Sequence, residues 1–363
     1  MKLFPELEKR YSEDQYSTRE SQRMAEFIAF GPIVFQATRL MLKYGILALL
    51  REHDEGLTQE EICERLKLPE YPVKCLVEAS LCIGTILVDP KTDKFRISRI
   101  GWFLLTDAAT KVNFDFNNDV NYMGLFYLDE SFRNGKPEGL KTLGVWDTIY
   151  EGLSSLPEPA RESWFAFDHF YSDGSFDEAL KVIFDRPVKR LLDIGGNTGK
   201  WALQCVGYDK DVEVTILDLP QQIALMRRAI KGKNGAERIK GLEMNILSDD
   251  GIPSSNEYDI IWMSQFLDCF SENQIAQILR KAVTVMGKDS RLCIMELLWN
   301  RQKYEPAAFC LTMTSLYFTA MANGNSKMYY SEDLIRLING AGMRVEKIID
   351  GIGQGHNILI CRR

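Results

Sequence analysis

The chain has few of the residues that bind metal ions. It contains three histidines, His53, His169 and His356, and no pair of them has a spacing typical of metal ligands. Its eight cysteines are scattered without a Cys-x-x-Cys pair, which argues against a zinc site or a disulfide framework. We therefore expect a metal-independent protein whose free thiols lie in a reducing, cytoplasmic compartment.

Long apolar runs and an excess of positive charge are also absent. No run reaches the roughly 18 apolar residues of a membrane-spanning helix, and the polar N-terminus is unlike a signal peptide. The net charge of −7 disfavours nucleic acid as the main partner. A chain of 363 residues is long enough for two domains. These features predict a protein that acts on neither a membrane nor a nucleic acid.

The most informative stretch that is present reads LLDIGGNTGKWA, from Leu191 to Ala202. Its apolar start predicts a buried strand. Gly195 and Gly196 then predict a sharp turn in which the backbone can come close to a ligand, and Gly199 allows the next helix to pack near the strand. The N–H groups at the start of that helix would face the same ligand.

Two phosphate-binding sequence patterns do not match this turn. A P-loop needs Ser or Thr after Gly-Lys, but Trp201 follows Lys200, and Ile194 occupies the place of the first glycine. A dinucleotide fingerprint, Gly-x-Gly-x-x-Gly, requires glycine where Asn197 and Lys200 stand. The turn therefore predicts a different ligand.

The third pattern, acidic-x-Gly-x-Gly-x-Gly, occurs in methyltransferases that use S-adenosylmethionine. Asp193, Gly195 and Gly199 match it, and Asn197 replaces the middle glycine. Asn is the next-best residue for a left-handed backbone, so this departure is mild. The next apolar run ends in Asp218, whose carboxylate can accept hydrogen bonds from both hydroxyls of a ribose. We predict S-adenosylmethionine as the cofactor.

The N-terminal part predicts a dimerisation domain. Apolar residues from Met24 to Leu50 form a stripe wider than one small domain needs, which favours a second subunit as partner. Thr58 and Glu61 form a capping box for a short helix. A second helix from about Pro72, ended by Gly84, and two short strands around residues 89–93 complete a winged helix.

A winged helix often binds DNA, but this one lacks the charge for it. The second helix carries Lys74 as its one basic residue, whereas a surface that follows phosphates needs several. We therefore expect residues 1–105 to mediate homodimerisation.

Strands and helices alternate from Arg190 onward. Apolar runs begin near residues 191, 212, 241, 258 and 291, helical segments separate most of them, and an antiparallel pair ends the chain. This alternation predicts a parallel sheet covered on both faces, with ligands at the carboxyl ends of the strands. We assign residues 186–363 to this Rossmann-like α/β domain and residues 106–185 to a helical connector that contributes to a substrate pocket.

The chain as a whole resembles the small-molecule O-methyltransferases of the plant caffeate and acetylserotonin type, including their bacterial relatives. Residues 37–66 are similar to the dimerising winged helix of that family, Leu191–Ala202 to its cofactor loop, and Thr215–Ile223 to its ribose-binding segment. The resemblance implies a small-molecule acceptor and a set of cofactor-binding residues: Asp193, Gly195, Gly196, Asn197, Gly199, Asp218, Leu219, Asn245, Ile246 and Ser264.

The chain departs from the family pattern at the residues that the family uses to remove the acceptor proton. The family places a general-base His in a segment like Leu-His-Asp-Trp, where this chain has Leu267-Asp268-Cys269-Phe270. A Glu that orients that His matches Glu296, while a second family Glu falls near Met328 and is lost. We predict that Asp268 accepts the proton of an acceptor hydroxyl with Glu296 alongside, because burial and pairing raise the pKa of a carboxyl.

Other interpretations remain open at this point. Asp268 could end its strand or cap the helix that begins near Ser271, and His169 could supply a base. The acceptor could be an amine or a carbanion that needs no base, or the chain could bind the cofactor without catalysis. The aromatic segment 164–171, with Trp299 and residues 310–321, indicates an apolar and aromatic substrate pocket.

Overall fold

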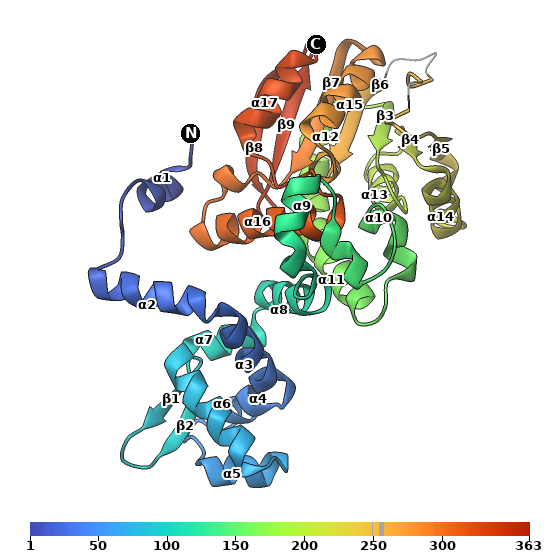
Figure 1. Cartoon of the computed structure of the whole chain (residues 1–363). Coiled ribbons are helices and arrows are strands. Elements are labelled where there is room, and N and C mark those ends of the chain that lie inside the picture. The colour runs from blue at the N-terminus through green and yellow to red at the C-terminus, as the bar shows by residue number, and fades with distance from the viewer. Residues whose placement is uncertain (249, 254–257) are drawn as a thin grey trace. The chain divides into compact units, whose positions relative to one another are not determined.

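The chain forms two compact units in the computed structural model, which describes residues 1–248, 250–253 and 258–363 (Figure 1). The smaller unit contains residues 14–115. The larger unit contains residues 1–13 and 116–363. The predicted connector, residues 106–185, is therefore divided between the units, and most of it belongs with the methyltransferase-like part.

The smaller unit contains the predicted helices and hairpin. Its amphipathic stretch is broken into three helices, because Gly31-Pro32 starts a new helix and Gly45, with φ of 76°, starts another. The capping box of Thr58 and Glu61 is present. The elements are α2 (Thr18–Ala29), α3 (Gly31–Lys43), α4 (Ile46–Arg51), α5 (Gln59–Leu66), α6 (Glu70–Ile83), β1 (Ile86–Asp89), β2 (Lys94–Ile97), α7 (Arg99–Thr106) and the start of α8 (Ala108–Phe116).

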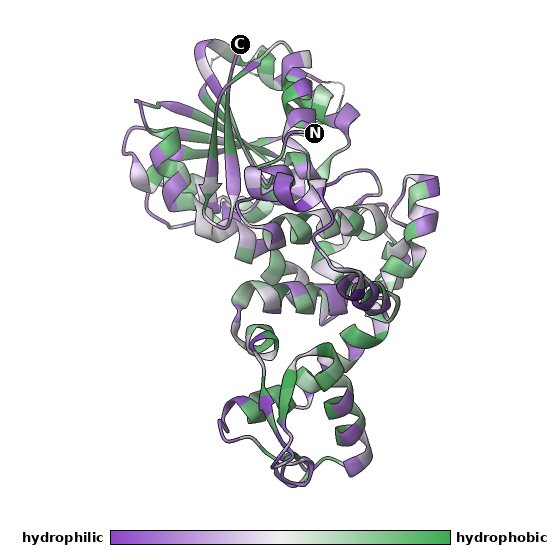
Figure 2. Cartoon of the chain, turned by 90° about the vertical axis from the view of Figure 1, so that its left-hand side faces the viewer, coloured by the Kyte–Doolittle hydropathy of each residue, from purple (hydrophilic) through white to green (hydrophobic). Residues whose placement is uncertain are grey.

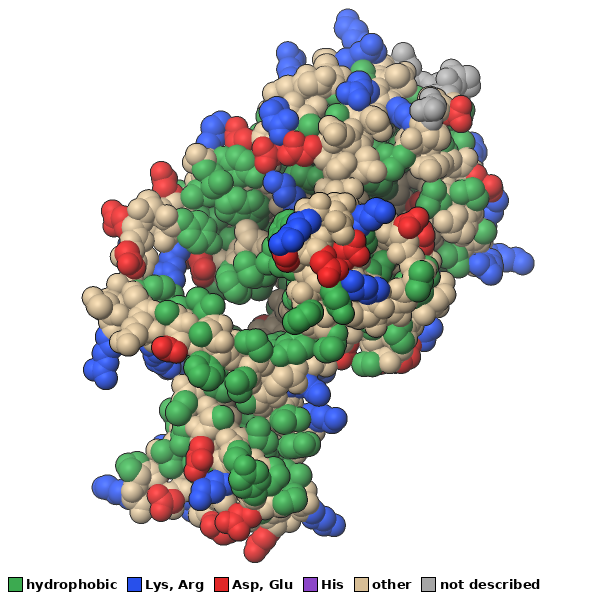
Figure 3. All heavy atoms as spheres, viewed as in Figure 1, with side chains coloured by type: hydrophobic (Ala, Val, Ile, Leu, Met, Phe, Trp, Pro, Cys, Tyr) green, Lys and Arg blue, Asp and Glu red, His purple; other side chains and the backbone are tan. Residues whose placement is uncertain are grey.

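Gly84 ends α6 with φ of 93°, as its position predicted, and β1 and β2 pair antiparallel. The core of the unit lies between α3, α4, α5, α6 and β1, and contains Met41, Leu47, Ile62 and Val77. Acidic side chains gather on the surface near α5, and α6 carries Lys74 as its one basic residue (Figure 3).

Several large apolar side chains of the smaller unit remain exposed. Ile28, Phe30 and Ile33, on and between α2 and α3, are 71%, 56% and 63% exposed. Among the described residues, no single helix is long and apolar enough to cross a membrane, although the bent pair α2 and α3 passes by length and composition. An apolar surface of this kind marks an interaction site.

The larger unit is built on a seven-stranded sheet with the order β5-β4-β3-β6-β7-β9-β8. The first five strands in that order are parallel, while β9 is antiparallel to both β7 and β8. The predicted terminal antiparallel pair is therefore confirmed. The strands are β3 (Arg190–Ile194), β4 (Glu213–Asp218), β5 (Ile239–Glu243), β6 (Tyr258–Ser264), β7 (Met286–Glu296), β8 (Arg344–Ile352) and β9 (His356–Arg362).

The two faces of the sheet are buried by different helices. Leu192 and Ile194 point into a core with α15 (Glu272–Thr284) and α17 (Ser331–Gly340). Leu191, one residue out of phase, points into a second core with α12 (Phe176–Ile183), α13 (Lys200–Tyr208) and α14 (Pro220–Ile230). This period-two alternation explains why the central strands are apolar on both sides (Figure 2).

A helical layer covers the carboxyl ends of the parallel strands. Its core contains Phe116, Leu140, Tyr317 and Met321. Two π-helical turns, at residues 117–121 and 318–322, lie in this layer, and such turns occur often at functional sites. The remaining helices of the unit are α1 (Pro5–Ser12), α9 (Leu128–Asn134), α10 (Ile149–Gly152), α11 (Ala160–Ser172) and α16 (Glu305–Tyr317), with short 3-10 turns between them.

Candidate active site

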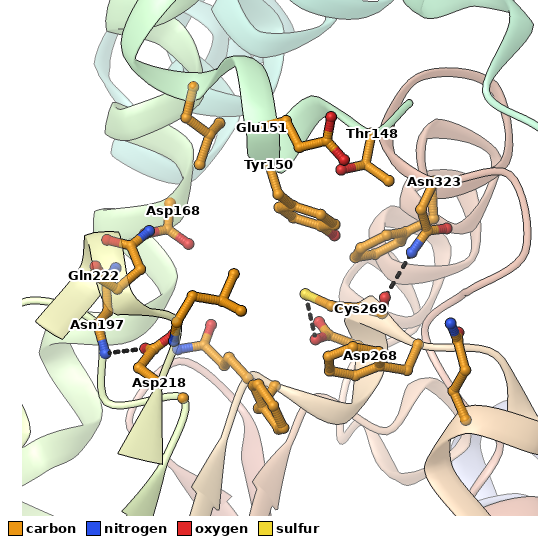
Figure 4. Close-up of a pocket in the computed structure, with 18 of the residues that line it drawn as sticks. Thr148, Tyr150, Glu151, Asp168, Asn197, Asp218, Gln222, Asp268, Cys269 and Asn323 are labelled. Atoms are coloured by element: carbon orange, nitrogen blue, oxygen red, sulfur yellow. Dashed lines mark hydrogen bonds between the residues drawn. The ribbon is translucent and has the colours of Figure 1, made fainter. Parts of the chain in front are cut away.

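A cavity of about 520 Å³ opens in the larger unit, at the carboxyl ends of the parallel strands (Figure 4). The turn after β3, the end of β4 and the turn after β6 form one side, and residues of α10, α11 and α16 form the other. This is the edge where the sequence predicted the ligand. The cavity therefore places the candidate cofactor residues and the aromatic helix around one space.

The glycine-rich turn takes the backbone conformation that its sequence predicted. Gly195 has φ of 81° and Asn197 has φ of 49°, and both line the cavity. A Cβ on Gly195 would overlap the ring of Phe266, and a Cβ on Gly196 would overlap the carboxylate of Asp193. Glycine at these two positions lets the turn lie directly against the next strand end.

Asp193 does not line the cavity, and neither do Gly196 and Gly199. Successive side chains of β3 point to opposite faces of the sheet. Asp193 therefore points away from the face of Leu192 and toward the helices on the other face. The carboxyl is buried, and its Oδ2 has no hydrogen-bond partner among the described residues. Burial raises the pKa of Asp193 to about 8, and the negative charge of Asp218 adds to the shift. Its direct contact with a cofactor remains a prediction.

The shifted pKa of Asp193 predicts how stability depends on pH. In the folded chain the group titrates near 8, whereas an unfolded Asp titrates near ~3.9, so the folded state binds the extra proton between these values. The stability that Asp193 contributes is complete below the lower value and is lost as pH rises toward 8, by at most about 1.4 kcal/mol per pH unit. Asp193→Asn should therefore become more stable relative to the wild type between pH 6 and pH 8.

Urea unfolding followed by tryptophan fluorescence at pH 6, 7 and 8 measures this difference. The exposed residue Asp211 provides the matched control, because Asp211→Asn should differ from the wild type by the same amount at each pH. A stability difference for Asp193→Asn that does not change with pH would show that the carboxyl is ionised in the folded chain.

Asp218 lies at the end of β4 and holds the glycine turn from the other side. Its Oδ2 accepts a hydrogen bond from the N–H of Asn197 at 2.9 Å, and its Oδ1 accepts one from the N–H of Leu219 at 2.8 Å. Burial raises the pKa of Asp218, and these two hydrogen bonds oppose the shift. The carboxylate therefore lines the cavity in a fixed orientation, with lone pairs left for a ligand hydroxyl.

Asn245 and Ile246 also line the cavity, beyond the end of β5. The Asn245 side chain accepts the N–H of Leu247 at 3.0 Å, and Lys281 from α15 donates to the carbonyls of Ile246 and Ser248. This segment is thus fastened to α15, with apolar and amide groups that suit a planar base. Ser264 does not line the cavity; its neighbour Gln265, with φ of 47°, does so instead.

Asp268 lies in a 3-10 turn after β6 and lines the cavity. Glu296, at the end of β7, is buried beneath this turn, and its Oε1 accepts hydrogen bonds from the N–H groups of Phe266 at 3.0 Å and Leu267 at 2.8 Å. Glu296 does not itself line the cavity. The structure therefore brings the two predicted carboxyls together, but only Asp268 faces the cavity.

The surroundings make Asp268 a base that suits neutral pH. Burial raises the pKa of Asp268 to about 7, the Cys269 thiol opposes this with a hydrogen bond, and the charge of Asp168 adds to it. Burial raises the pKa of Glu296 well above its usual range, and the charge of Asp268 adds to that shift. Ionisation of one of these two carboxyls therefore disfavours ionisation of the other.

The alternative interpretations of this segment find less support in the geometry. Ser271, not Asp268, caps α15, through a capping box with Gln274. His169 lies on an exposed part of α11, where its Nδ1 is 3.2 Å from the Lys200 ammonium, and it does not line the cavity. Asp268 is thus the carboxyl that faces the cavity on this turn.

Aromatic and apolar side chains form the rest of the cavity wall. Trp164, Phe167 and Tyr171 lie on one face of α11 and line the cavity. Trp299 does not line it and instead lies against the ring of Tyr330 in a tilted arrangement. Trp164 donates to the hydroxyl of Tyr317 at 2.8 Å, which fixes two of these rings. The segment 310–321 contributes five lining residues: Cys310, Leu311, Thr314, Tyr317 and Phe318.

Sequence patterns missed several polar residues of the cavity: Tyr150, Glu151, Asp168, Gln222 and Asn323. Asp168 and Gln222 lie in segments that the sequence had singled out for other residues, whereas Tyr150, Glu151 and Asn323 lie in segments without a recognisable motif. The fold brings all five together. Asn323, for example, donates to the carbonyl of Cys269 at 2.6 Å from the π-helical turn after α16. The Tyr150 hydroxyl is buried, and it has no hydrogen-bond partner among the described residues.

Comparison with known proteins identifies the family. The family model described as "Dimerisation2-like domain" matches residues 22–95, and the one described as "O-methyltransferase domain" matches residues 172–344. The chain therefore contains an O-methyltransferase domain preceded by a domain of the dimerisation type. The predicted family, the order of its two domains and the dimerisation type of its first domain are therefore confirmed.

Relatives and solved structures are similar to this methyltransferase over much of its length. It is 21% identical to "Acetylserotonin O-methyltransferase" of Gallus gallus over 318 residues, which covers 86% of this chain and 88% of the relative. It is 24% identical to "Bacteriochlorophyllide d C-20 methyltransferase" of Chlorobaculum tepidum over 153 residues, or 41% of this chain and 44% of the relative. The apo structure of the S-adenosylmethionine-dependent methyltransferase SibL superposes with a TM-score of 0.69 at 22% identity, covering 93% of this chain and 98% of that one.

The methyltransferase has a site that fits the cofactor of its family, S-adenosylmethionine. The turn at Gly195 has no room for a Cβ, Asp218 presents an oriented carboxylate, and Asn245 and Ile246 flank the space beyond it. Acidic side chains in the cavity wall complement a cationic sulfonium group. The predicted cofactor is thus confirmed for the family, and which residue makes each contact remains a proposal.

Proposed function

We propose that this enzyme methylates a hydroxyl group of a small aromatic molecule. S-adenosylmethionine, when bound, supplies an electrophilic methyl group on a positively charged sulfur. The chain has to hold the acceptor oxygen within about 3–3.5 Å of that methyl, in line with the departing sulfur. The observation that carries the proposal is the position of Asp268: a carboxyl with a pKa of about 7 that faces an aromatic cavity beside the cofactor turn.

Asp268 would accept the proton of the acceptor hydroxyl. A phenol has a pKa of about 10, so a base that titrates near neutral pH removes its proton better than an ordinary Asp. Glu296 would act as a positioning residue, since it holds the backbone of the turn through two N–H groups. The buried Tyr150 hydroxyl points toward Cys269 and Asp268 and supplies a second hydrogen-bonding group for the acceptor (Figure 4).

Transfer of isotope-labelled methyl from S-adenosylmethionine to a panel of phenols, amines and carbon acids tests the proposal. Labelled ethers as products support it. Binding of the cofactor without transfer to any acceptor would point to a non-catalytic binder. Label on carbon would favour the second candidate, a C-methyltransferase, which the similarity to the bacteriochlorophyllide C-20 enzyme brings into consideration.

The smaller unit supports a second proposal, homodimerisation. Ile28, Phe30 and Ile33 are exposed on and between α2 and α3, within residues that the dimerisation-type family model matches. Burial of such side chains in a second copy of the chain would stabilise a dimer, at about 25 cal/mol per Å² of apolar surface.

The eight free cysteines support a reducing, cytoplasmic location.

Substitution of charge into this surface should dissociate the dimer. Ile28→Asp combined with Ile33→Asp is expected to give monomers in light scattering after gel filtration, at concentrations where the wild type is dimeric. Leu87→Asp is the matched control, because Leu87 is 52% exposed on β1 and should leave the dimer intact. Dimers that survive the double substitution would place the subunit interface elsewhere.

A further inference from the structure

The charged groups of the cavity all have the same sign. Glu151, Asp168, Asp218 and Asp268 line it, and among the described lining residues there is no Lys, Arg or His. Asp218 and Asp168 lie on the cofactor side, near Asn197 and Gln222 (Figure 4). Because S-adenosylmethionine is a cation overall, these two carboxylates have a partner in the cofactor. Glu151 and Asp268 are then the two carboxylates that can interact with the acceptor.

Glu151 and Asp268 lie on opposite sides of the acceptor space. Glu151 is on α10, next to Tyr150 and Thr148, and its carboxylate has no ion-pair partner among the described residues (Figure 4). Asp268 and Cys269 lie across the cavity from them. An acceptor that reaches Asp268 with its hydroxyl would therefore present its far end to Glu151.

Aromatic rings form much of the cavity wall. Tyr150, Trp164, Phe167 and Tyr317 line the cavity, and the buried Tyr150 hydroxyl has no partner in the described structure. Faces of such rings attract a cation but not an anion. A carboxylate on the acceptor would find neither a basic side chain nor a favourable ring face here, and it would be repelled by the acidic groups.

From this arrangement we infer that the acceptor is a phenol carrying a protonated amine, with the ammonium near Glu151 and Tyr150 and the hydroxyl near Asp268. Aromatic acids are excluded as good acceptors by the same charges. The inference rests on the proposed function, because it assigns the chemical class of the molecule that the enzyme methylates. It also assigns Glu151 as a specificity-determining residue, which makes no contact with the reacting oxygen.

Three matched phenols test this inference: one ring with an aminoethyl, a hydroxyethyl or a carboxymethyl group para to the hydroxyl. Calorimetric titration into the enzyme saturated with S-adenosylhomocysteine measures their binding without turnover. We expect the cationic phenol to bind at least about tenfold more tightly than the anionic one, with the neutral phenol between them. Equal affinities, tighter binding of the anion, or no binding of the cation at 10 mM would overturn the inference.

A pair of substitutions locates the effect. Glu151→Gln should weaken the cationic phenol by about three- to fivefold relative to the neutral one, as expected for a partly solvated ion pair. Glu162→Gln, an exposed carboxylate of α11 that does not line the cavity, should leave this ratio unchanged. An unchanged ratio in Glu151→Gln would remove Glu151 from the site.

Methyl transfer separates failure of this inference from failure of the proposed function. If labelled methyl reaches the neutral and anionic phenols better than the cationic one, the O-methyltransferase assignment stands and the inference fails. If S-adenosylmethionine binds and no phenol of the series is methylated although the cation binds most tightly, the inference about charge stands and the proposed reaction fails.

Discussion

Asp268→Asn is expected to lower the turnover of this enzyme by about 10²- to 10⁴-fold, the usual contribution of a general base. Asn keeps the size and one oxygen of the side chain but cannot accept a proton at neutral pH. The affinity for S-adenosylmethionine should not change, because the predicted cofactor residues that line the cavity follow β3, β4 and β5 and not β6. Initial rates with labelled methyl donor and calorimetric titration with the cofactor measure the two quantities separately.

The pH dependence of the rate provides a second test of the same residue. A base with a pKa of about 7 is protonated at lower pH, so kcat/KM of the wild type should fall as pH decreases through 7. This fall of kcat/KM toward lower pH should be absent in Asp268→Asn. In Glu296→Gln it should persist, because the amide oxygen of Gln can still accept the N–H groups of Phe266 and Leu267 and keep the turn in place.

Full turnover in Asp268→Asn would contradict the proposed role. The acceptor would then be one that needs no proton removal, such as an amine or a carbanion. A loss of turnover accompanied by an equal loss of cofactor affinity would instead indicate that Asp268 maintains the shape of the turn.

Asp218→Ala is expected to lower the affinity for S-adenosylmethionine by about 100-fold or more. Hydrogen bonds to a charged group contribute about 1.5–3 kcal/mol each, and this carboxylate is proposed to bind both ribose hydroxyls. The substitution also removes the acceptor for the N–H groups of Asn197 and Leu219, so the glycine turn loses its partner. Calorimetric titration measures the dissociation constant directly.

Asp211→Ala is the matched control for this loss, because Asp211 is exposed just before the same strand and does not line the cavity. Its cofactor affinity should equal that of the wild type. The same affinity in Asp218→Ala would mean that the ribose is held elsewhere. Comparison of the unfolding midpoints of both variants separates a loss of binding from a loss of folding.

Local sequence patterns predicted much of the fold. The capping box at Thr58, the helix end at Gly84 and the left-handed position of Asn197 each depend on a few neighbouring residues, and all three appear in the structure. Alternation of strand and helix segments along the chain predicted the parallel sheet, and the last two apolar segments predicted its terminal antiparallel pair. Each of these features depends on residues that are close together in the sequence.

The cavity could be predicted only in part, because long-range packing assembles it. Tyr150 and Asp268 are far apart in the sequence and face the same space, and neither segment contains a motif that pairs them. Asp193 belongs to a motif, yet the pleat of β3 directs its side chain away from the cavity. A motif therefore identified the correct turn but not the direction of each side chain.

The N-terminal residues show the same limit. The N–H of Phe4 donates to the carbonyl of Asn300 at 3.2 Å, and α1 belongs to the larger unit. The side chain of Asn300 accepts from Ser331 and donates to the carbonyl of Lys2. No periodicity within residues 1–13 could have indicated partners that lie about 300 residues away.

Calorimetric titration of the purified chain with S-adenosylmethionine and, separately, with NAD tests the central claim most directly. The geometry of the turn from Asp193 to Gly199, with Asp218 beside it, predicts micromolar binding of S-adenosylmethionine and no binding of NAD. Binding of NAD alone, or of neither compound, would contradict the assignment of this cavity to the methyl donor.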